Sequence, residues 1–147
     1  MVKKIVTFAI LLGSMVNCST AFADTKVAVV DIQKVVNSSN QIKALKKEQD
    51  AKKKEIAQFI KKAGEEIKKQ PDLAKKKALA EKYDKELADK QSANAKTYKA
   101  KFEAADKNIS DTIANQAKAQ GYDVVFAKGV VLYGGDDITE SVLKVVK

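Results

Sequence analysis

Residues 41–120 contain only two residues that break helices, Gly64 and Pro71. Alanine, lysine, glutamate and glutamine dominate this stretch, and all four are good helix formers. Because the residue before a proline is driven out of α geometry, Pro71 divides the stretch into two parts. We therefore expect one helix over 41–70 and another over 72–120, roughly 45 Å and 70 Å long at about 1.5 Å per residue.

The apolar residues of both expected helices recur at spacings of three and four, which places them on one narrow stripe of each helix. Such a stripe is too narrow to enclose a globular core. Two stripes can face each other in an antiparallel coiled-coil hairpin with Pro71 at its tip. The end of the second helix, residues 101–120, would extend past its partner and pack on the remaining segments. Polar residues at seam positions, such as Gln49 and Lys52, predict loosely packed, flexible arms.

Four aromatic residues lie on the expected helices: Phe59, Tyr83, Tyr98 and Phe102. We favour the interpretation that they fill the seam of the hairpin, because apolar residues at helical spacing usually pack against a neighbouring helix. The alternative is that they offer apolar contact points to a binding partner.

The segment before the helical stretch is short and apolar, as is typical of a β-strand. Residues 26–36 read KVAVVDIQKVV, which predicts a strand to about Ile32 with apolar residues on both faces. Ser38, Ser39 and Asn40 follow, and these residue types are suitable caps for the first long helix.

The segment after the helical stretch also favours strands. Residues 121–147 read GYDVVFAKGVVLYGGDDITESVLKVVK. This pattern predicts strands over 122–127 and 130–133, joined as a hairpin. A final helix would follow, capped by Asp137 and Glu140. The sequence thus predicts an α+β fold, with a small β-rich head from 24–39 and 121–147 and a helical hairpin arm over 40–120.

The first 23 residues have the organisation of a secretory signal peptide. Lys3 and Lys4 precede an uncharged apolar stretch, and an A-x-A cleavage pattern ends at Ala23, directly before Asp24. The apolar stretch is shorter than the roughly 20 residues of a membrane-spanning helix. Lipidation at Cys18 is disfavoured because the preceding residue is not small. Cleavage between Ala23 and Asp24 would export the chain and remove its only cysteine.

The expected head is too small to be stable alone. Its pieces total roughly 38 residues, and folds below about 40 residues usually need disulfides, metals or oligomerisation. The chain has no histidine, and cleavage would remove its cysteine, so we expect identical copies to share one core. The expected oligomerisation core consists of Val27, Val29, Val30, Ile32, Val124, Val125, Phe126, Val130 and Leu132.

Charge is concentrated in the arm, where residues 40–118 contain 21 lysines against 13 acidic residues. The chain has no arginine, the residue that best reads phosphates and bases, so we do not expect nucleic-acid binding. Lysines around Pro71 are either a solvated surface or a contact surface for an unfolded client protein or an anionic lipid. The candidates for such contacts are Lys68, Lys69, Lys75, Lys76 and Lys77.

The sequence gives little support for catalysis. Histidine is absent, and no glycine-rich phosphate loop occurs. The carboxylates near the head are Asp31, which ends the first strand, and Asp136 and Asp137, which we expect to cap a helix. We therefore predict no catalytic residues, no metal site and no cofactor.

The strand KVAVVDIQKVV, the long Lys/Ala/Glu/Gln hairpin and the ending GYDVVFAKGVVLYGGDDITESVLKVVK resemble the Skp (OmpH-like) periplasmic chaperone family. The resemblance implies a jellyfish-like homotrimer, in which a β-rich hub holds three helical tentacles around a cavity. It also implies ATP-independent holding of unfolded outer-membrane proteins in the periplasm. The alternative from a different class is a structural coiled-coil protein of the envelope that binds anionic lipid or cell wall.

Overall fold

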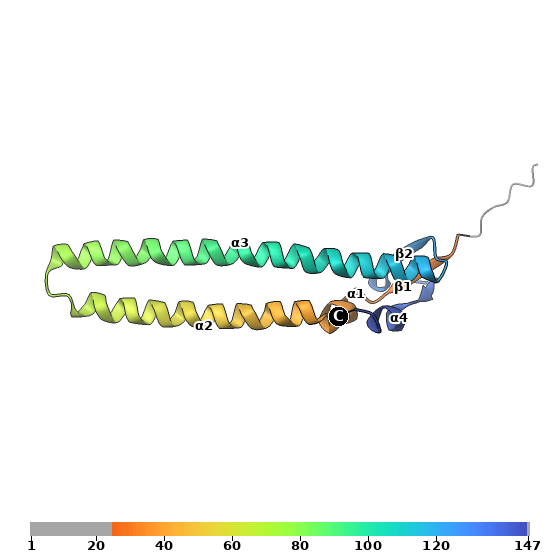
Figure 1. Ribbon diagram of the computed structural model, residues 1–147, viewed down its shortest axis with the longest axis horizontal. Coiled ribbons are helices and arrows are strands. Elements are labelled where there is room, and N and C mark those ends of the chain that lie inside the picture. Colours follow the sequence, from red (N-terminus) through yellow and green to blue (C-terminus); the bar gives the residue numbers. More distant parts are fainter. Residues whose placement is uncertain (1–24, 147) are drawn as a thin grey trace, which may run out of the picture.

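Two long antiparallel helices and a small sheet make up the computed structural model, which describes residues 25–146 (Figure 1). Helix α2 covers Asn40–Lys69 and helix α3 covers Leu73–Ala119, and the two lie side by side. The short connection at Pro71 forms the far end of the molecule. The two predicted helices and the position of the tip are confirmed.

Side-chain caps define where both long helices begin. Ser39 Oγ accepts a hydrogen bond from the backbone N–H of Ile42 at 3.5 Å, as expected for the cap of the first long helix. Asp72 Oδ1 accepts one from the backbone N–H of Lys75 at 2.8 Å. Each cap satisfies a donor that the first helical turn leaves without a backbone partner.

The sheet contains three parallel strands in the order β2-β1-β3. Strand β1 covers Val27–Val30, β2 covers Val124–Ala127 and β3 covers Asp136–Asp137. Both strands from the C-terminal segment pair with β1, which therefore lies at the centre. Val29 is opposite Phe126 on one side and opposite Asp137 on the other.

The predicted hairpin between 122–127 and 130–133 is wrong. Residues Lys128–Val130 form a short 3-10 helix, η1, and residues 131–135 are not a strand. Strand β1 has two edges, and pairing both with C-terminal pieces satisfies backbone groups along each of them. The chain reaches the second edge through Gly134 and Gly135, whose φ angles are 89° and 86°. A Cβ atom at Gly135 would lie 2.9 Å from Val29 Cγ1, so this close approach favours glycine.

A short helix that the sequence pattern did not predict follows the first strand. Helix α1 covers Ile32–Ser38, and Asp31 Oδ1 caps it by accepting a hydrogen bond from the backbone N–H of Lys34 at 3.0 Å. The strand therefore ends at Val30 rather than near Ile32. An aspartate is a strong N-cap residue, and it overrides the β-branched composition of the segment.

The core lies where the two chain ends meet the base of the arm. Helix α4, Thr139–Leu143, packs there together with α1 and the sheet. The end of α3 joins this core, which confirms the prediction that it packs on the terminal segments. The buried cluster consists of Ala28, Val30, Val35, Ile42, Ala105, Ile109, Ala117, Ile138, Val142 and Val146.

Candidate functional site

The residues predicted as an oligomerisation core fall into two groups in a single chain. Val29 and Val30 are buried, and Ile32 and Val125 pack against the core cluster from its edge. Val27, at the start of β1, is half-buried. The remaining members are exposed and all come from residues 124–132: Val124, Phe126, Val130 and Leu132.

The exposed group gives the head an apolar outer surface. Leu132 and the neighbouring Tyr133 have exposed fractions of 103% and 98%, values close to those of an isolated residue. Tyr133 was not among the predicted residues, although the pattern VVLY contains it. Val124 and Phe126 point to the side of β2 opposite Val125 because successive strand residues alternate. Large exposed apolar groups of this kind mark interaction surfaces.

The polar residues of the seam have partners in the structure. The side-chain amides of Gln49 and Asn94 exchange two hydrogen bonds across the seam, at 3.4 and 3.2 Å. Lys52 pairs with Glu55 on the same helix at 2.7 Å, and this contact raises the pKa of Lys52 and lowers that of Glu55. The Gln49–Asn94 pair thus joins the two helices at this height through polar contacts.

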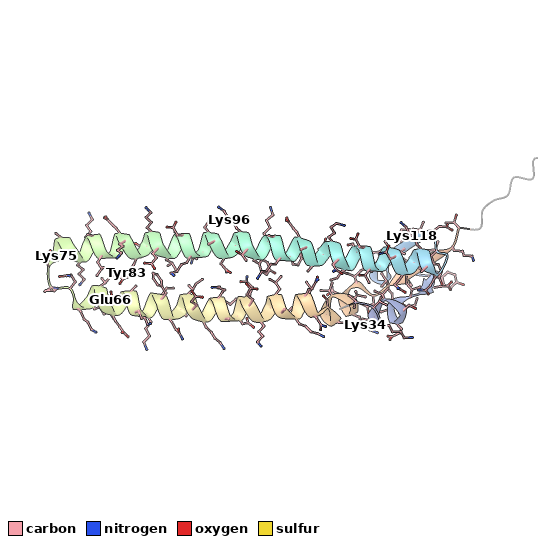
Figure 2. All side chains as sticks on the ribbon, in the orientation of Figure 1. Lys34, Glu66, Lys75, Tyr83, Lys96 and Lys118 are labelled. Atoms are coloured by element: carbon pink, nitrogen blue, oxygen red, sulfur yellow. The ribbon has the colours of Figure 1, made fainter. Side chains whose placement is uncertain are left out.

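One aromatic pair fills the seam as expected. Phe59 and Tyr83, from opposite helices, meet edge to face with ring centroids 5.7 Å apart. The Tyr83 hydroxyl donates a short hydrogen bond to Glu66, which raises the pKa of the tyrosine. Lys90 Nζ lies 5.2 Å from the centroid of the Phe59 ring. These contacts join α2 and α3 in the outer half of the arm (Figure 2).

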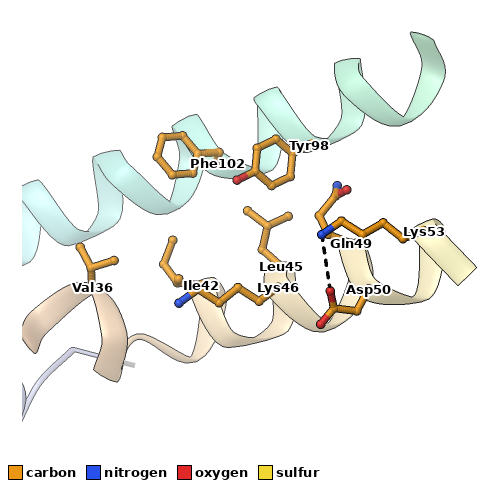
Figure 3. A pocket seen from close by; sticks show the side chains of 9 residues that line it. All are labelled: Val36, Ile42, Leu45, Lys46, Gln49, Asp50, Lys53, Tyr98 and Phe102. Atoms are coloured by element: carbon orange, nitrogen blue, oxygen red, sulfur yellow. Dashed lines mark ion pairs between the residues drawn. The ribbon is translucent and has the colours of Figure 1, made fainter. Parts of the chain in front are cut away.

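The second aromatic pair borders an open trough at the base of the arm (Figure 3). Tyr98 and Phe102, one turn apart on α3, are stacked with an interplanar angle of 20° and centroids 6.0 Å apart. Below them lie the buried residues Ile42 and Leu45 of α2, and Val36 closes one end. The trough, which we call the arm-base trough, has a volume of about 580 Å³. Its remaining lining residues are Lys46, Gln49, Asp50 and Lys53.

The tip of the arm combines lysines with an exposed leucine. Leu73, the first residue of α3, is 81% exposed. The predicted contact residues lie on either side of the Pro71 connection, with Lys68 and Lys69 ending α2 and the others in the first turns of α3. Within residues 25–146 none of these five lysines forms an ion pair. The tip is therefore a basic surface with an apolar centre.

The carboxylates of the head make structural contacts, but the predicted capping box of Asp137 and Glu140 is wrong. Asp136 and Asp137 form β3, and the N-cap position of α4 is Ile138, which has no side-chain cap. Asp137 Oδ2 pairs with Lys128 Nζ at 2.6 Å, and its Oδ1 accepts the backbone N–H of Thr139 at 2.9 Å. These donors hold the pKa of Asp137 well below its ordinary value. Asp136 accepts a hydrogen bond from the Tyr122 hydroxyl at 3.0 Å.

Two further observations concern metals and membranes. In the part of the chain that the structure describes, no group of three or more possible ligand side chains could hold a metal ion. Across residues 25–146, no helix is both long and apolar enough to span a bilayer. The predicted signal peptide and its cleavage site between Ala23 and Asp24 lie outside the described residues.

The fold and its exposed surfaces define a class of protein in which a small α+β head holds one long, basic helical hairpin. The sequence profile of the family described as "Outer membrane protein (OmpH-like)" matches residues 26–146, almost the full described length. The chain therefore belongs to the OmpH-like family. No curated protein matches it.

Proposed function

We propose that this protein is an ATP-independent holdase chaperone of the periplasm, which binds unfolded outer-membrane or other envelope proteins and prevents their aggregation. The observation that supports this most is the exposed apolar surface of a head that holds a long basic arm. Association of several heads would cover that surface and bring the arms around a common space. Membership of the OmpH-like family is consistent with such a role.

Assembly is the first part of the proposal. The exposed residues Val124, Phe126, Val130 and Leu132, with Tyr133, would form the contacts between copies. The outer edges of β2 and β3 have no strand beside them within residues 25–146, and open edges are competent to pair with another chain. Family resemblance suggests three copies, a homotrimer. The export that the first 23 residues predict would place this assembly in the periplasm.

Client binding is the second part. With 21 lysines against 13 acidic residues in 40–118, three arms would create a positive field that attracts acidic segments of an unfolded chain. Many weak contacts confined to one space give avidity without a strong individual contact. Weak contacts also release a client without nucleotide hydrolysis, as a holdase requires.

An aggregation assay tests the proposal. A urea-denatured outer-membrane β-barrel protein is diluted into buffer, and light scattering is followed with and without the purified protein. We expect scattering to be suppressed at about one assembled holdase per client, and suppression to weaken at high salt because surface charges are screened. Unchanged scattering at several-fold excess would contradict the proposal.

The tip favours a second candidate, a structural envelope protein that binds anionic lipid or cell wall. Leu73 among Lys68, Lys69, Lys75, Lys76 and Lys77 combines an apolar group with unpaired cations. This is the chemistry of an anionic membrane surface. Co-sedimentation with vesicles containing anionic lipid separates the candidates. Tight vesicle binding without suppression of aggregation would favour the structural role.

A further inference from the structure

The two aromatic pairs of the arm have similar composition but different environments. Phe59 and Tyr83 contact each other across the seam, whereas Tyr98 and Phe102 lie side by side on one helix. The exposed fractions of Tyr98 and Phe102 are 40% and 46%, although both rings adjoin buried apolar residues of α2. Their packing within the chain is thus incomplete, and the uncovered ring surface borders the arm-base trough (Figure 3).

The dimensions of the arm-base trough restrict what it can bind. Its volume of about 580 Å³ is in the range of small-molecule sites and holds roughly two or three large side chains. A helix, about 10–12 Å across with its side chains, would contact the trough only through the side chains of one face. In an extended chain, side chains on one face recur about every 7 Å. The Tyr98 and Phe102 centroids are 6.0 Å apart, so alternate side chains of an extended segment would meet one ring each.

The charges at the rim of the arm-base trough also restrict what can bind there. Lys46 Nζ lies 3.5 Å from Asn37 Oδ1 and, within residues 25–146, has no carboxylate partner. Lys53 pairs with Asp50 at 3.8 Å, and both side chains of that pair are largely exposed. Lys46 is therefore a cation without a carboxylate partner beside the apolar floor, and it would complement an acidic residue of the occupant.

We propose that the arm-base trough is a subsite for an extended segment of unfolded polypeptide with aromatic or large apolar side chains at alternate positions and an acidic residue beside them. This inference rests on the proposed holdase function and names the kind of segment that the arm selects. Stacking on Tyr98 and Phe102 over Leu45 would bind the alternate side chains, and Lys46 would bind the acid. An alternating segment would therefore bind better than a helical segment of the same composition.

A labelled peptide tests this subsite directly. The probe is a fluorescein-labelled 12-residue peptide in which four aromatic residues occupy alternate positions and the other residues are threonine and glutamate. A control peptide has the same composition with its aromatic residues every three or four positions. We expect the alternating peptide to bind at least about fivefold more tightly by fluorescence anisotropy, since in an extended chain only its aromatic side chains recur at a distance close to the ring spacing. Equal affinity for both peptides would overturn the selectivity.

A matched pair of variants locates the binding. The double substitution Tyr98→Gln with Phe102→Gln removes both rings from half-exposed positions and keeps good helix formers. It should weaken the alternating peptide about tenfold, because two aromatic contacts are lost. Leu73→Gln removes an exposed apolar residue at the tip and should change affinity less than about twofold. Equal effects of the two variants would place the binding elsewhere and overturn the inference.

Parallel measurements separate this inference from the proposed function. If the wild-type protein suppresses aggregation but the double variant binds the peptide normally, the subsite is wrong and the holdase role stands. If the wild-type protein fails to suppress aggregation, the holdase role fails whatever the peptide does. The double variant should keep the solution mass of the wild type. A fall in mass would identify the trough as a contact between copies and overturn the inference. The inference would also be overturned if the double variant bound the labelled peptide as tightly as the wild type and sodium laurate displaced that peptide.

Discussion

Asp137 connects three parts of the head through one carboxylate. Its Oδ2 pairs with Lys128 of η1, and its Oδ1 accepts both the backbone N–H and the hydroxyl of Thr139 at the start of α4. Thr139 Oγ1 in turn accepts the backbone N–H of Asp31 at 2.9 Å, directly after β1. Thr139 itself is buried, so this chain of hydrogen bonds fixes the strand ends relative to the final helix.

Asp137→Asn should destabilise the head at neutral pH. The amide loses the charge that pairs with Lys128, and we expect the free energy of unfolding to fall by about 1 kcal/mol at pH 7, the scale of one hydrogen bond to a charged group at a partly exposed site. Glu140→Gln, at an exposed position of α4, is the control and should have a smaller effect. Urea unfolding at one fixed protein concentration measures the free energy of unfolding of both variants.

The same contact makes stability depend on pH. The pKa of Asp137 is lower in the folded chain than in the unfolded chain, whose value is about 3.9. Its contribution is therefore complete above the unfolded pKa and is lost as the pH falls towards the folded pKa. The difference in stability between wild type and Asp137→Asn should shrink as the pH falls below about 4. A difference that is constant from pH 7 to pH 3 would contradict this assignment.

At the scale of elements, the two helix caps differ in what they hold in place. Ser39 is fully buried at the junction between α1 and α2, and its backbone N–H also donates to Val35 and Val36 carbonyls. Asp72 lies at the exposed tip, far from the core. Loss of the first cap therefore affects the base of the arm, whereas loss of the second affects only its end.

Ser39→Ala should lower the free energy of unfolding by about 1 kcal/mol, the usual value for a helix N-cap. Asp72→Ala should leave global stability nearly unchanged and increase amide hydrogen exchange in the first turns of α3. Hydrogen exchange followed by mass spectrometry distinguishes the effects of the two variants. If Asp72→Ala raised exchange in the head as strongly as at the tip, arm and head would be one cooperative unit.

At the scale of the whole molecule, the arm could be predicted from the sequence and the head only in part. Helix-forming composition, the stripe and Pro71 act locally, so they fix the hairpin directly. The pairing of β2 and β3 with opposite edges of β1 depends on contacts between residues about a hundred positions apart, such as Val29 with Phe126. Local patterns cannot distinguish that arrangement from a hairpin.

The arm-base trough, like the pairing of the strands, could not be predicted from local sequence patterns. The sequence identified Tyr98 and Phe102 as aromatic residues of the stripe, and the seam was the favoured place for them. Whether a ring is covered depends on the residue opposite it on α2, where Leu45 and Gln49 leave space that an aromatic residue would fill. That juxtaposition follows from the register of the two helices, which a single sequence does not specify.

Leu132→Asp tests how copies associate without disturbing the fold of one chain. Leu132 is fully exposed, so a charge there costs a single chain little. In an interface between heads, the same charge would be buried without a partner, which is strongly unfavourable. We expect the variant to keep its helical circular dichroism and to lose mass on dilution. Lys75→Asp at the tip is the control and should keep the wild-type mass.

The solution mass of the wild-type protein is the most direct test of the account. Sedimentation equilibrium over a range of concentrations gives this mass, and sedimentation velocity gives the frictional ratio of the same sample. We predict an elongated particle with three times the mass of one chain, since the apolar residues at 124–133 would be covered by other copies. A stable single chain at micromolar concentration would contradict it.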